Sequence, residues 1–379
     1  MSTRAKKPRL FYIDNLRILL TILVIMHHFA IGYGAPGGFW YRENGPMSDV
    51  SEILLTLLVA INQSFFMGFF FMISSYFSPG SIDRKGGGVY LKDRLKRLGI
   101  PSLFYMLVTV PLLGYVGRWR SGFKGTLVEH LTFHYSDIGH FGVAQMWFVV
   151  ALLFFAVVHV IWRRFAKPMS DSQGAAPGNV AIAIFALVLG VVTFTVRIWL
   201  PVDWEIPLLN WQVPHFPQYI ALYVVGLVAY RRNWFETVTD AQRKVWSRMI
   251  LVLIVLFPVL FVAAGALEGN IDSAMGGFHW ESLAYSVWEQ FMCMAMVITL
   301  LVWFRNRFTE QGRLAKAMSG AAYATYVFHA PTIVLLAIAL RGIRLDMALK
   351  YVLVVPFAVA LAFLVGYLVK KLPVAKDIL

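Results

Sequence analysis

The feature that most limits what this chain can fold into is its succession of long apolar segments. A transmembrane helix needs about 20 consecutive, mostly apolar residues. Ten segments meet or approach that length, namely residues 11–33, 52–78, 98–116, 143–162, 180–200, 216–230, 246–266, 281–304, 318–340 and 347–369. None of them shows the alternating pattern of a β-barrel strand. The sequence therefore predicts an all-α, polytopic membrane helix bundle with about ten transmembrane helices.

The composition of the 379 residues agrees with this fold class. Apolar residues make up 59% and charged residues 14%, whereas soluble domains carry about 25% charge. The single cysteine, Cys293, excludes an intrachain disulfide framework and a zinc cluster built on cysteines. The first segment is too long for the core of a cleaved signal peptide and should persist as a helix. We expect one membrane domain over residues 1–379, with no fused soluble domain.

The basic residues predict an orientation for the bundle. The net charge is +14, and 25 Lys and Arg fall on one set of alternate loops, against 6 on the other set. Basic loops face the cytoplasm, so we expect both termini in the cytoplasm and an even number of spans through the inner (cytoplasmic) membrane. The bases are dispersed over several loops and offer no surface that fits a nucleic-acid groove. Nucleic acid is therefore not expected as a partner.

Ionisable side chains within membrane spans are costly, and they are usually paired or functional. Asp14 and Arg17 are three residues apart and can pair on a helix. Arg17 and His28 are eleven apart, which places them on one helix face about 16 Å apart along the axis. This face predicts a polar cavity where neutral His28 acts as a general base. Alternatively, both residues are structural: Arg17 snorkels to the lipid headgroups, and His28 forms a hydrogen bond to a neighbouring helix. His27 points about 100° away and is the weaker candidate.

Later segments add further polar candidates. Glu289 lies deep in its segment, where a carboxylate needs a partner such as His28 or an arginine. Either a role in a polar site or a structural ion pair would explain a glutamate at this depth. Tyr326 and His329 share a helix face, which fits either a site or an interhelical hydrogen bond. Arg197, near the end of its segment, is expected to snorkel.

Four bases precede the third segment: Lys92, Arg94, Lys96 and Arg97. They can orient the chain and attract anionic lipids, with about 1 kcal/mol for each base. They can equally bind the phosphates of coenzyme A, because arginine forms bidentate phosphate contacts. The stretch DRKGGG, residues 83–88, is expected to be a loop. The loop motif HYSDIGH could ligate a metal, but such residues in a loop are more typical of a solvated surface, so no metal is predicted.

Several stretches together resemble the acyltransferase-3 family of integral membrane acyltransferases. FYIDNLRILLTILVIMHHFAIGY looks like the family's opening helix, in which ten residues separate a base from a histidine, here Arg17 and His28. FFFMISSYFSPG followed by YLKDRLKRLGIP is similar to a family helix end and its basic R-x-x-R run, here Arg94 and Arg97. In the first of these, Ser75 replaces the commoner glycine.

Three later stretches continue the resemblance in the expected order. They are QMWFVVALLFF, WEQFMCMAMVITLLVWFR and AAYATYVFHAP, the last of which contains Tyr326 and His329. The matches extend over about residues 10–340. In length, and in lacking an extra domain, the chain resembles the subgroup named for the biosynthesis of periplasmic glucans.

The resemblance implies a membrane-bound O-acyltransferase, transferring groups other than amino-acyl groups. Acyl-CoA would be the donor substrate, with an acyl group of the acetyl or succinyl type, and the acceptor would be a hydroxyl of a carbohydrate or another envelope molecule. Among the predicted catalytic residues, the resemblance implies His28 and Arg17, and their positions in the apolar segments add Asp14 and Glu289. Among the predicted donor-binding residues, the resemblance implies Arg94, Arg97, His329 and Tyr326, and the basic run adds Lys92. Direct transfer and a transient acyl-histidine are both compatible with these residues.

Two other classes of protein remain as alternatives. A secondary transporter or exporter of a small polar or acylated molecule would also carry ionisable groups near the membrane midplane. It would usually show inverted repeats, and this sequence contains no internal repeat. A non-catalytic membrane scaffold would tolerate leucine in place of both Arg17 and His28.

Overall fold

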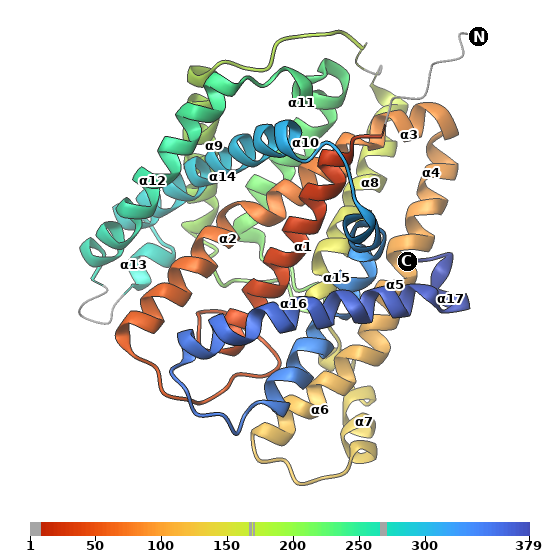
Figure 1. Ribbon diagram of the computed structural model, residues 1–379, viewed down its shortest axis with the longest axis vertical. Helices are drawn as coiled ribbons and strands as arrows, with labels where there is room; N and C mark the ends of the chain where they lie inside the picture. Colours follow the sequence, from red (N-terminus) through yellow and green to blue (C-terminus); the bar gives the residue numbers. More distant parts are fainter. Residues whose placement is uncertain (1–8, 167–168, 170, 266–270) are drawn as a thin grey trace.

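The computed structural model describes residues 9–166, 169, 171–265 and 271–379, and the described chain consists mostly of helices joined by loops (Figure 1). Its long helices are α1 (Phe11–Gly32), α2 (Asp49–Tyr76), α8 (Trp147–Phe165), α9 (Asn179–Arg197), α10 (Phe216–Arg232), α12 (Asp240–Ala263), α14 (Trp280–Arg307), α15 (Arg313–Ala339) and α16 (Met347–Lys371). Shorter ones are α3 (Ser78–Lys85), α4 (Gly87–Arg94), α5 (Ile100–Phe104), α6 (Val110–Arg120), α7 (Leu127–Tyr135), α11 (Trp234–Thr237), α13 (Asp272–Met275) and α17 (Pro373–Lys376). The prediction of an all-α bundle is confirmed.

Nine stretches of the described chain are long and apolar enough to cross a membrane. They correspond to nine of the ten predicted segments. The remaining segment, 216–230, forms α10, which has 17 residues. At 1.5 Å per residue, this helix is about 26 Å long, somewhat less than the roughly 30 Å of a bilayer core. The exact number of spans, and with it the cytoplasmic location of both termini, stays a prediction.

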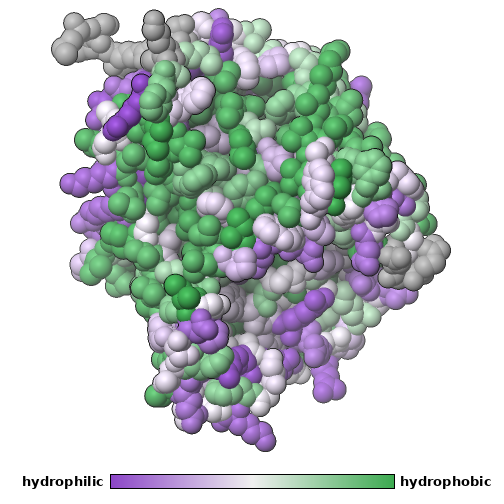
Figure 2. Space-filling model, turned by 180° about the vertical axis from the view of Figure 1, so that it is seen from behind, coloured by the Kyte–Doolittle hydropathy of each residue, from purple (hydrophilic) through white to green (hydrophobic). Residues whose placement is uncertain are grey.

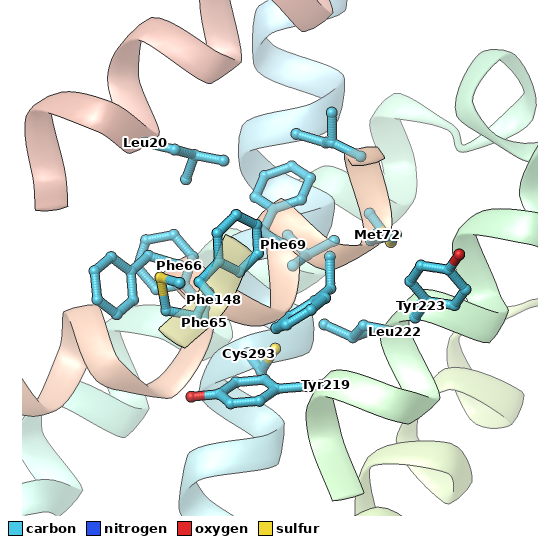
Figure 3. Close-up of a cluster of buried hydrophobic side chains, with 14 of the residues drawn as sticks. Leu20, Phe65, Phe66, Phe69, Met72, Phe148, Tyr219, Leu222, Tyr223 and Cys293 are labelled. Atoms are coloured by element: carbon cyan, nitrogen blue, oxygen red, sulfur yellow. The ribbon is translucent and has the colours of Figure 1, made fainter. Parts of the chain in front are cut away.

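The central helices of the bundle are α1, α14 and α15. About two thirds or more of their apolar windows are buried, at 67%, 72% and 67% respectively, whereas α9, α12 and α16 are only 22%, 17% and 22% buried. Figure 3 shows the main core, where aromatic side chains of α2 meet side chains of α1, α8, α10 and α14. The packing of aromatic rings in this core fixes the distances between the central helices.

The outside of the bundle is apolar over much of its area. Figure 2 shows a broad hydrophobic surface with the polar residues concentrated toward its edges. On α12, for example, Leu251, Val255 and Val259 are 66%, 68% and 58% exposed. A soluble protein would not leave such a wide apolar surface in water. Together with the long apolar helices, this surface identifies a multi-pass membrane protein.

The predicted loop at residues 83–88 is largely helical, and that prediction is wrong. α3 extends to Lys85, and α4 begins at Gly87. Only Gly86 interrupts them, with φ of +79°, a left-handed conformation that glycine adopts without strain. From Gly87 the chain stays helical to Arg120, through π-helical turns at Leu95–Gly99 and Tyr105–Thr109. Such turns often occur at functional sites, and the first one contains Arg97.

The connection between α1 and α2 folds back against the bundle. Its Glu43 is buried and accepts a hydrogen bond at 2.5 Å from the Nζ of Lys350 on α16. The same ammonium group donates to the carbonyl oxygens of Leu340 and Ile343, at 2.8 and 2.9 Å. This buried cluster holds the connection, which contains Phe39 and Trp40, in a fixed position.

Candidate active site

A pair of histidines joins α1 to α15. The imidazoles of His28 and His329 approach to 2.9 Å between Nδ1 of His28 and Nε2 of His329. The Nδ1 of His329 lies 2.5 Å from the carbonyl oxygen of Tyr326. The ring of His28 also stacks on Phe39, with 5.3 Å between ring centroids. Two separate elements therefore fix the plane of the His28 ring.

The hydrogen-bond pattern assigns the positions of the protons on these two rings. A carbonyl oxygen can only accept, so Nδ1 of His329 must carry a hydrogen and donate to Tyr326. In a neutral His329, Nε2 is then the acceptor, and Nδ1 of His28 donates to it. Consequently Nε2 of His28 holds a lone pair. This is the protonation pattern that a general base requires.

His28 lies in the wall of a cavity of about 590 Å³, which we call the histidine cavity. Aromatic and polar side chains line it, among them Phe39, Trp40, Gln63, Gln145, Trp147, Asp203, Glu205, Gln212 and His215. Its size is within the 300–1,000 Å³ usual for small-molecule sites. The cavity can thus hold a polar molecule next to the His28 ring.

A second cavity, of about 620 Å³, lies along the same helices, and we call it the basic cavity. Five basic side chains line it, from α1, α3, α4 and the π-helical turn: Arg17, Lys85, Arg94, Lys96 and Arg97. Two acidic residues in its wall, Asp93 and Asp377, offset only part of this positive charge. Lys92 is exposed and does not line the cavity.

Helix α1 contributes to both cavities, with Arg17 in the basic cavity and His28 in the histidine cavity. Tyr326 on α15 lines both of them. Its hydroxyl donates a hydrogen bond to the carbonyl oxygen of Gln145, next to the start of α8. The two cavities therefore meet at the side chain of Tyr326, whose hydroxyl is held by its hydrogen bond to Gln145.

Asp14 lies beside Arg17 rather than in either cavity wall. One carboxylate oxygen of Asp14 is 3.4 Å from Nη1 of Arg17, and the other is 2.7 Å from Nε of Arg9. The side chain of Arg17 remains 42% exposed. Asp14 can therefore orient this guanidinium group and leave it available to an anion.

Glu289 lies in a separate buried cluster, and no hydrogen bond or ion pair joins it to His28. Its carboxylate is 2.7 Å from Nη2 of Arg197 and 3.3 Å from Nδ1 of His215. Arg197 is 0% exposed, so the expectation that it snorkels to the headgroups is wrong. The position of Glu289, an acid on a neighbouring central helix, provides the physical reason.

Sequence reasoning missed the role of His215 in this cluster. His215 precedes α10, and its ring also lies in the wall of the histidine cavity. No spacing rule links it to Glu289, because the two positions are 74 apart in the sequence and come together only through tertiary packing. A histidine that follows a proline just before an apolar segment was the available signal.

The structure also shows the surroundings of the loop motif HYSDIGH. Asp137 accepts a hydrogen bond from the backbone N–H of Gly139, and Nδ1 of His140 bonds the carbonyl oxygen of Phe133. His134 lies on α7, and its partial burial, followed by the neighbouring histidines, lowers the pKa of its imidazole. Within the described residues, no group of three or more His, Cys, Asp or Glu side chains has a geometry that could hold a metal ion.

The helical membrane bundle, with its histidine cavity and basic cavity, defines a class of membrane protein that could bring two substrates together. Residues 10–370 match the acyltransferase domain of the acyltransferase-3 family, and the chain belongs to this family of membrane acyltransferases.

The relatives that this chain resembles include the glucans biosynthesis protein C of Salmonella paratyphi B, Salmonella dublin and Salmonella typhimurium. Each is 26% identical over 234 residues, which cover 59% of this chain and 59% of the relative. The chain thus aligns with somewhat under two thirds of the length of these relatives. No solved structure matches it.

Proposed function

We propose that this protein transfers an acyl group, of the acetyl or succinyl type, from acyl-CoA to a hydroxyl group of a glycan or another envelope molecule. The observation that supports this most is the arrangement along α1. Arg17 faces a basic cavity, His28 faces a second cavity, and Tyr326 lies where the two meet. A donor and an acceptor could approach from opposite sides and react beside His28.

The basic cavity suits the donor. Coenzyme A carries several phosphate charges, and the guanidinium groups of Arg94 and Arg97 can contact phosphate oxygens in a bidentate manner. Arg17 lies in the same wall and can contact the same ligand deeper in the bundle. The distribution of bases in the sequence supports a cytoplasmic opening for this cavity. Lys92, outside the wall, would act only through long-range attraction.

The histidine cavity suits a sugar acceptor. Its aromatic side chains Trp40 and Trp147 offer flat apolar surfaces, and Asp203 and Glu205 offer oxygen atoms that accept hydrogen bonds from hydroxyl groups. The name of these relatives, glucans biosynthesis protein C, also favours a glucan. We expect this acceptor to arrive from the extracytoplasmic side of the inner membrane.

In the proposed reaction, Nε2 of His28 takes the proton from the acceptor hydroxyl while the hydroxyl oxygen attacks the thioester carbon. The C=O electrons move to oxygen, and a tetrahedral oxyanion forms. When this intermediate collapses, the C–S bond breaks, and the CoA thiolate takes the proton from His28. The products are an ester and CoA–SH. Transient acylation of His28 would use the same Nε2 atom, and trapping of a labelled acyl-protein would distinguish that route.

The test measures CoA release by the purified protein with acetyl-CoA or succinyl-CoA and a gluco-oligosaccharide, together with the acyl mass gained by the sugar. We expect His28→Ala to lower turnover by about 10²–10⁴-fold, the usual contribution of general acid–base catalysis. His159→Ala, on α8 and outside both cavities, is the matched control. Full turnover in His28→Ala would contradict the proposal. Ion-coupled solute uptake by vesicles without CoA release would instead favour a transporter.

A further inference from the structure

The proposed reaction gives no role to a polar side chain in the wall of the histidine cavity, Gln145. Gln145 lies in the wall of the histidine cavity, two residues before α8 begins. The oxygen Oε1 of its carboxamide accepts hydrogen bonds from Nε1 of Trp40, at 2.8 Å, and from the hydroxyl of Tyr105, at 3.0 Å. An indole N–H can only donate, so this contact identifies the atom of Gln145 that faces Trp40 as the oxygen.

The orientation of the carboxamide has a direct consequence for its other end. With Oε1 held by two donors, the Nε2 amino group must point away from Trp40 and Tyr105. Among the residues that the structure describes, none accepts a hydrogen bond from this amino group. The amino group is not among the fully buried polar atoms that lack a partner, so it retains exposed surface. Because Gln145 lines the histidine cavity, we take this surface to face the open space of that cavity. Two N–H donors are thus presented to whatever occupies that space.

The backbone around Gln145 is fixed as firmly as its side chain. The preceding residue, Ala144, has φ of +44°, a conformation that costs energy for any residue with a Cβ atom. Asn210 holds it there, because its Oδ1 accepts a hydrogen bond from the Ala144 N–H at 2.8 Å. On the other side, the carbonyl oxygen of Gln145 accepts from the hydroxyl of Tyr326. Strain that is held in place by several contacts is typical of functional sites.

The neighbours of Gln145 are also the neighbours of His28. Trp40, which orients the carboxamide, follows Phe39, which stacks on the His28 ring. Tyr326, which bonds the Gln145 backbone, supplies the carbonyl oxygen that fixes His329 and hence His28. The base and the amide donor are therefore positioned by the same set of side chains, at the point where the two cavities meet.

We propose that the carboxamide N–H of Gln145 donates to the oxyanion formed when the acceptor hydroxyl attacks the thioester, which rests on the acyl transfer proposed above. The negative charge develops on the former carbonyl oxygen while the proton moves to His28. A preorganised neutral donor lowers the energy of that state without any later rearrangement. Trp40 and Tyr105 are positioning residues for this donor, and neither contacts the reacting atoms.

The test compares Gln145→Leu and Gln145→Glu with the wild type in the full-length protein, using CoA release with acetyl-CoA and a gluco-oligosaccharide. Leucine removes the donor, and the loss of one oxyanion donor typically lowers kcat by about 10²–10³-fold. We expect a fall of that size in kcat and little change in KM for either substrate. Glutamate keeps an oxygen for Trp40 and Tyr105, so the fold around it should persist.

The proposal also predicts a distinctive pH dependence of kcat for Gln145→Glu. Above the pKa of the introduced carboxyl group, it has no hydrogen to donate and its negative charge repels the oxyanion, so its kcat should be no higher than that of Gln145→Leu. As the pH falls and the carboxyl group becomes protonated, its O–H can donate to the oxyanion. The ratio of its kcat to that of Gln145→Leu at the same pH should then rise. A purely structural role for Gln145 would leave Gln145→Glu near wild-type kcat at every pH.

Gln63→Leu is the comparison within the same cavity, on α2. It should alter the KM for the acceptor more than kcat. An equal fall in kcat for Gln63→Leu and Gln145→Leu would overturn the proposal, as would folded Gln145→Leu with wild-type kcat. CoA release by the wild-type protein distinguishes failure of this inference from failure of the proposed function. If the wild type releases no CoA, acyl transfer itself fails, whereas normal wild-type turnover with unaffected Gln145 variants rejects only the oxyanion donor.

Discussion

The protonation of His28 depends on a hydrogen-bond chain that begins in α15. The Tyr326 carbonyl oxygen fixes the proton of His329 at Nδ1, and His329 in turn fixes that of His28. His329 lies against His28 and lines neither cavity. We infer that it acts on the reaction through the orientation of His28, and its contact with the donor stays a prediction.

A change at His329 should therefore lower turnover without removing the base. In His329→Leu, the Nδ1–H of His28 loses its acceptor, and the ring can adopt the wrong tautomer or rotate. We expect kcat to fall by about 10²-fold or more, within the range for impaired acid–base catalysis. His329→Gln offers an oxygen to the same N–H and should retain more of the kcat. The measurement is CoA release at saturating substrates, with folding checked by size-exclusion chromatography.

Two results would count against this role. One is equal kcat in His329→Leu and the wild type. The other is a change confined to a higher KM for acyl-CoA, which would indicate that His329 contacts the donor. His159→Leu supplies the matched control, because His159 is also a buried histidine but lies outside both cavities.

At the scale of single residues, the helical period correctly placed Arg17 and His28 on α1 as residues that line cavities. The spacing could not show that these are two cavities, since that depends on the side chains of α4 and α15 that line them. Glu289 was known to need a charged partner, but the choice of Arg197 is a long-range contact between α9 and α14. A pattern within one helix carries no information about such contacts.

At the scale of elements, the connection between α1 and α2 depends on α16. Lys350 and Glu43 form a buried ion pair at 2.5 Å, and each side chain is almost fully inaccessible. Removing one partner of such a pair leaves an uncompensated charge in the interior. The connection contributes Phe39 and Trp40 to the active site, so its stability affects the reaction as well as the fold.

We expect Lys350→Met to lower stability by about 3–5 kcal/mol, the usual cost of breaking a buried ion pair from one side. The variant measured by thermal unfolding in detergent should show a clear fall in Tm. The double variant Lys350→Met/Glu43→Gln removes the stranded charge and should recover much of that loss. If the double variant is as unstable as the single one, the packing of the lysine stem, and not the ion pair, accounts for the effect.

Asp346 attaches the same connection to the start of α16. Its carboxylate accepts hydrogen bonds from the side chains of Ser48 and Ser51 and from the backbone N–H of Ala348. These bonds, first of all the one from Ser51, lower the pKa of Asp346 from 3.8 to about 2. A lowered pKa means that the folded state favours the ionised form.

The stabilisation by Asp346 should therefore be complete above pH 3.8 and be lost as the pH falls through about 2. Asp346→Asn has no carboxyl group to titrate at this position. The difference in Tm between wild type and variant should be constant at higher pH and shrink across this acid window. A difference that does not change with pH would show that the ionised form makes no special contribution.

The helices themselves were largely predictable, because a long apolar run has few alternatives to a helix in a bilayer. The shorter polar helices were not. α3 and α4 lie in a stretch rich in charge and glycine, which reads as a loop until their packing against neighbouring helices is known. α10 was predicted as a span, and its 17 residues leave it short of the usual span length.

At the scale of the whole molecule, two cavities of similar volume meet at one side chain. No sequence pattern could predict this arrangement, since α1, α2, α8 and α15 all contribute walls. The sequence did supply the family resemblance, which the match over residues 10–370 confirms. The sequence also indicated the basic run before the third segment. In the structure, Arg94 and Arg97 of this run line the basic cavity, and Lys92 does not.

Tyr326 should therefore control how strictly acyl transfer is coupled to the acceptor. An enzyme that handles a reactive thioester must exclude water from it until the acceptor is bound. In Tyr326→Ala, the two cavities would join, and water from the histidine cavity could reach the thioester. We expect CoA release without acceptor to rise severalfold relative to ester formation. Tyr323→Ala widens only the basic cavity and should keep the wild-type ratio. The ratio of CoA released to ester formed measures this coupling directly. An unchanged ratio in folded Tyr326→Ala would mean that other side chains separate the donor from water.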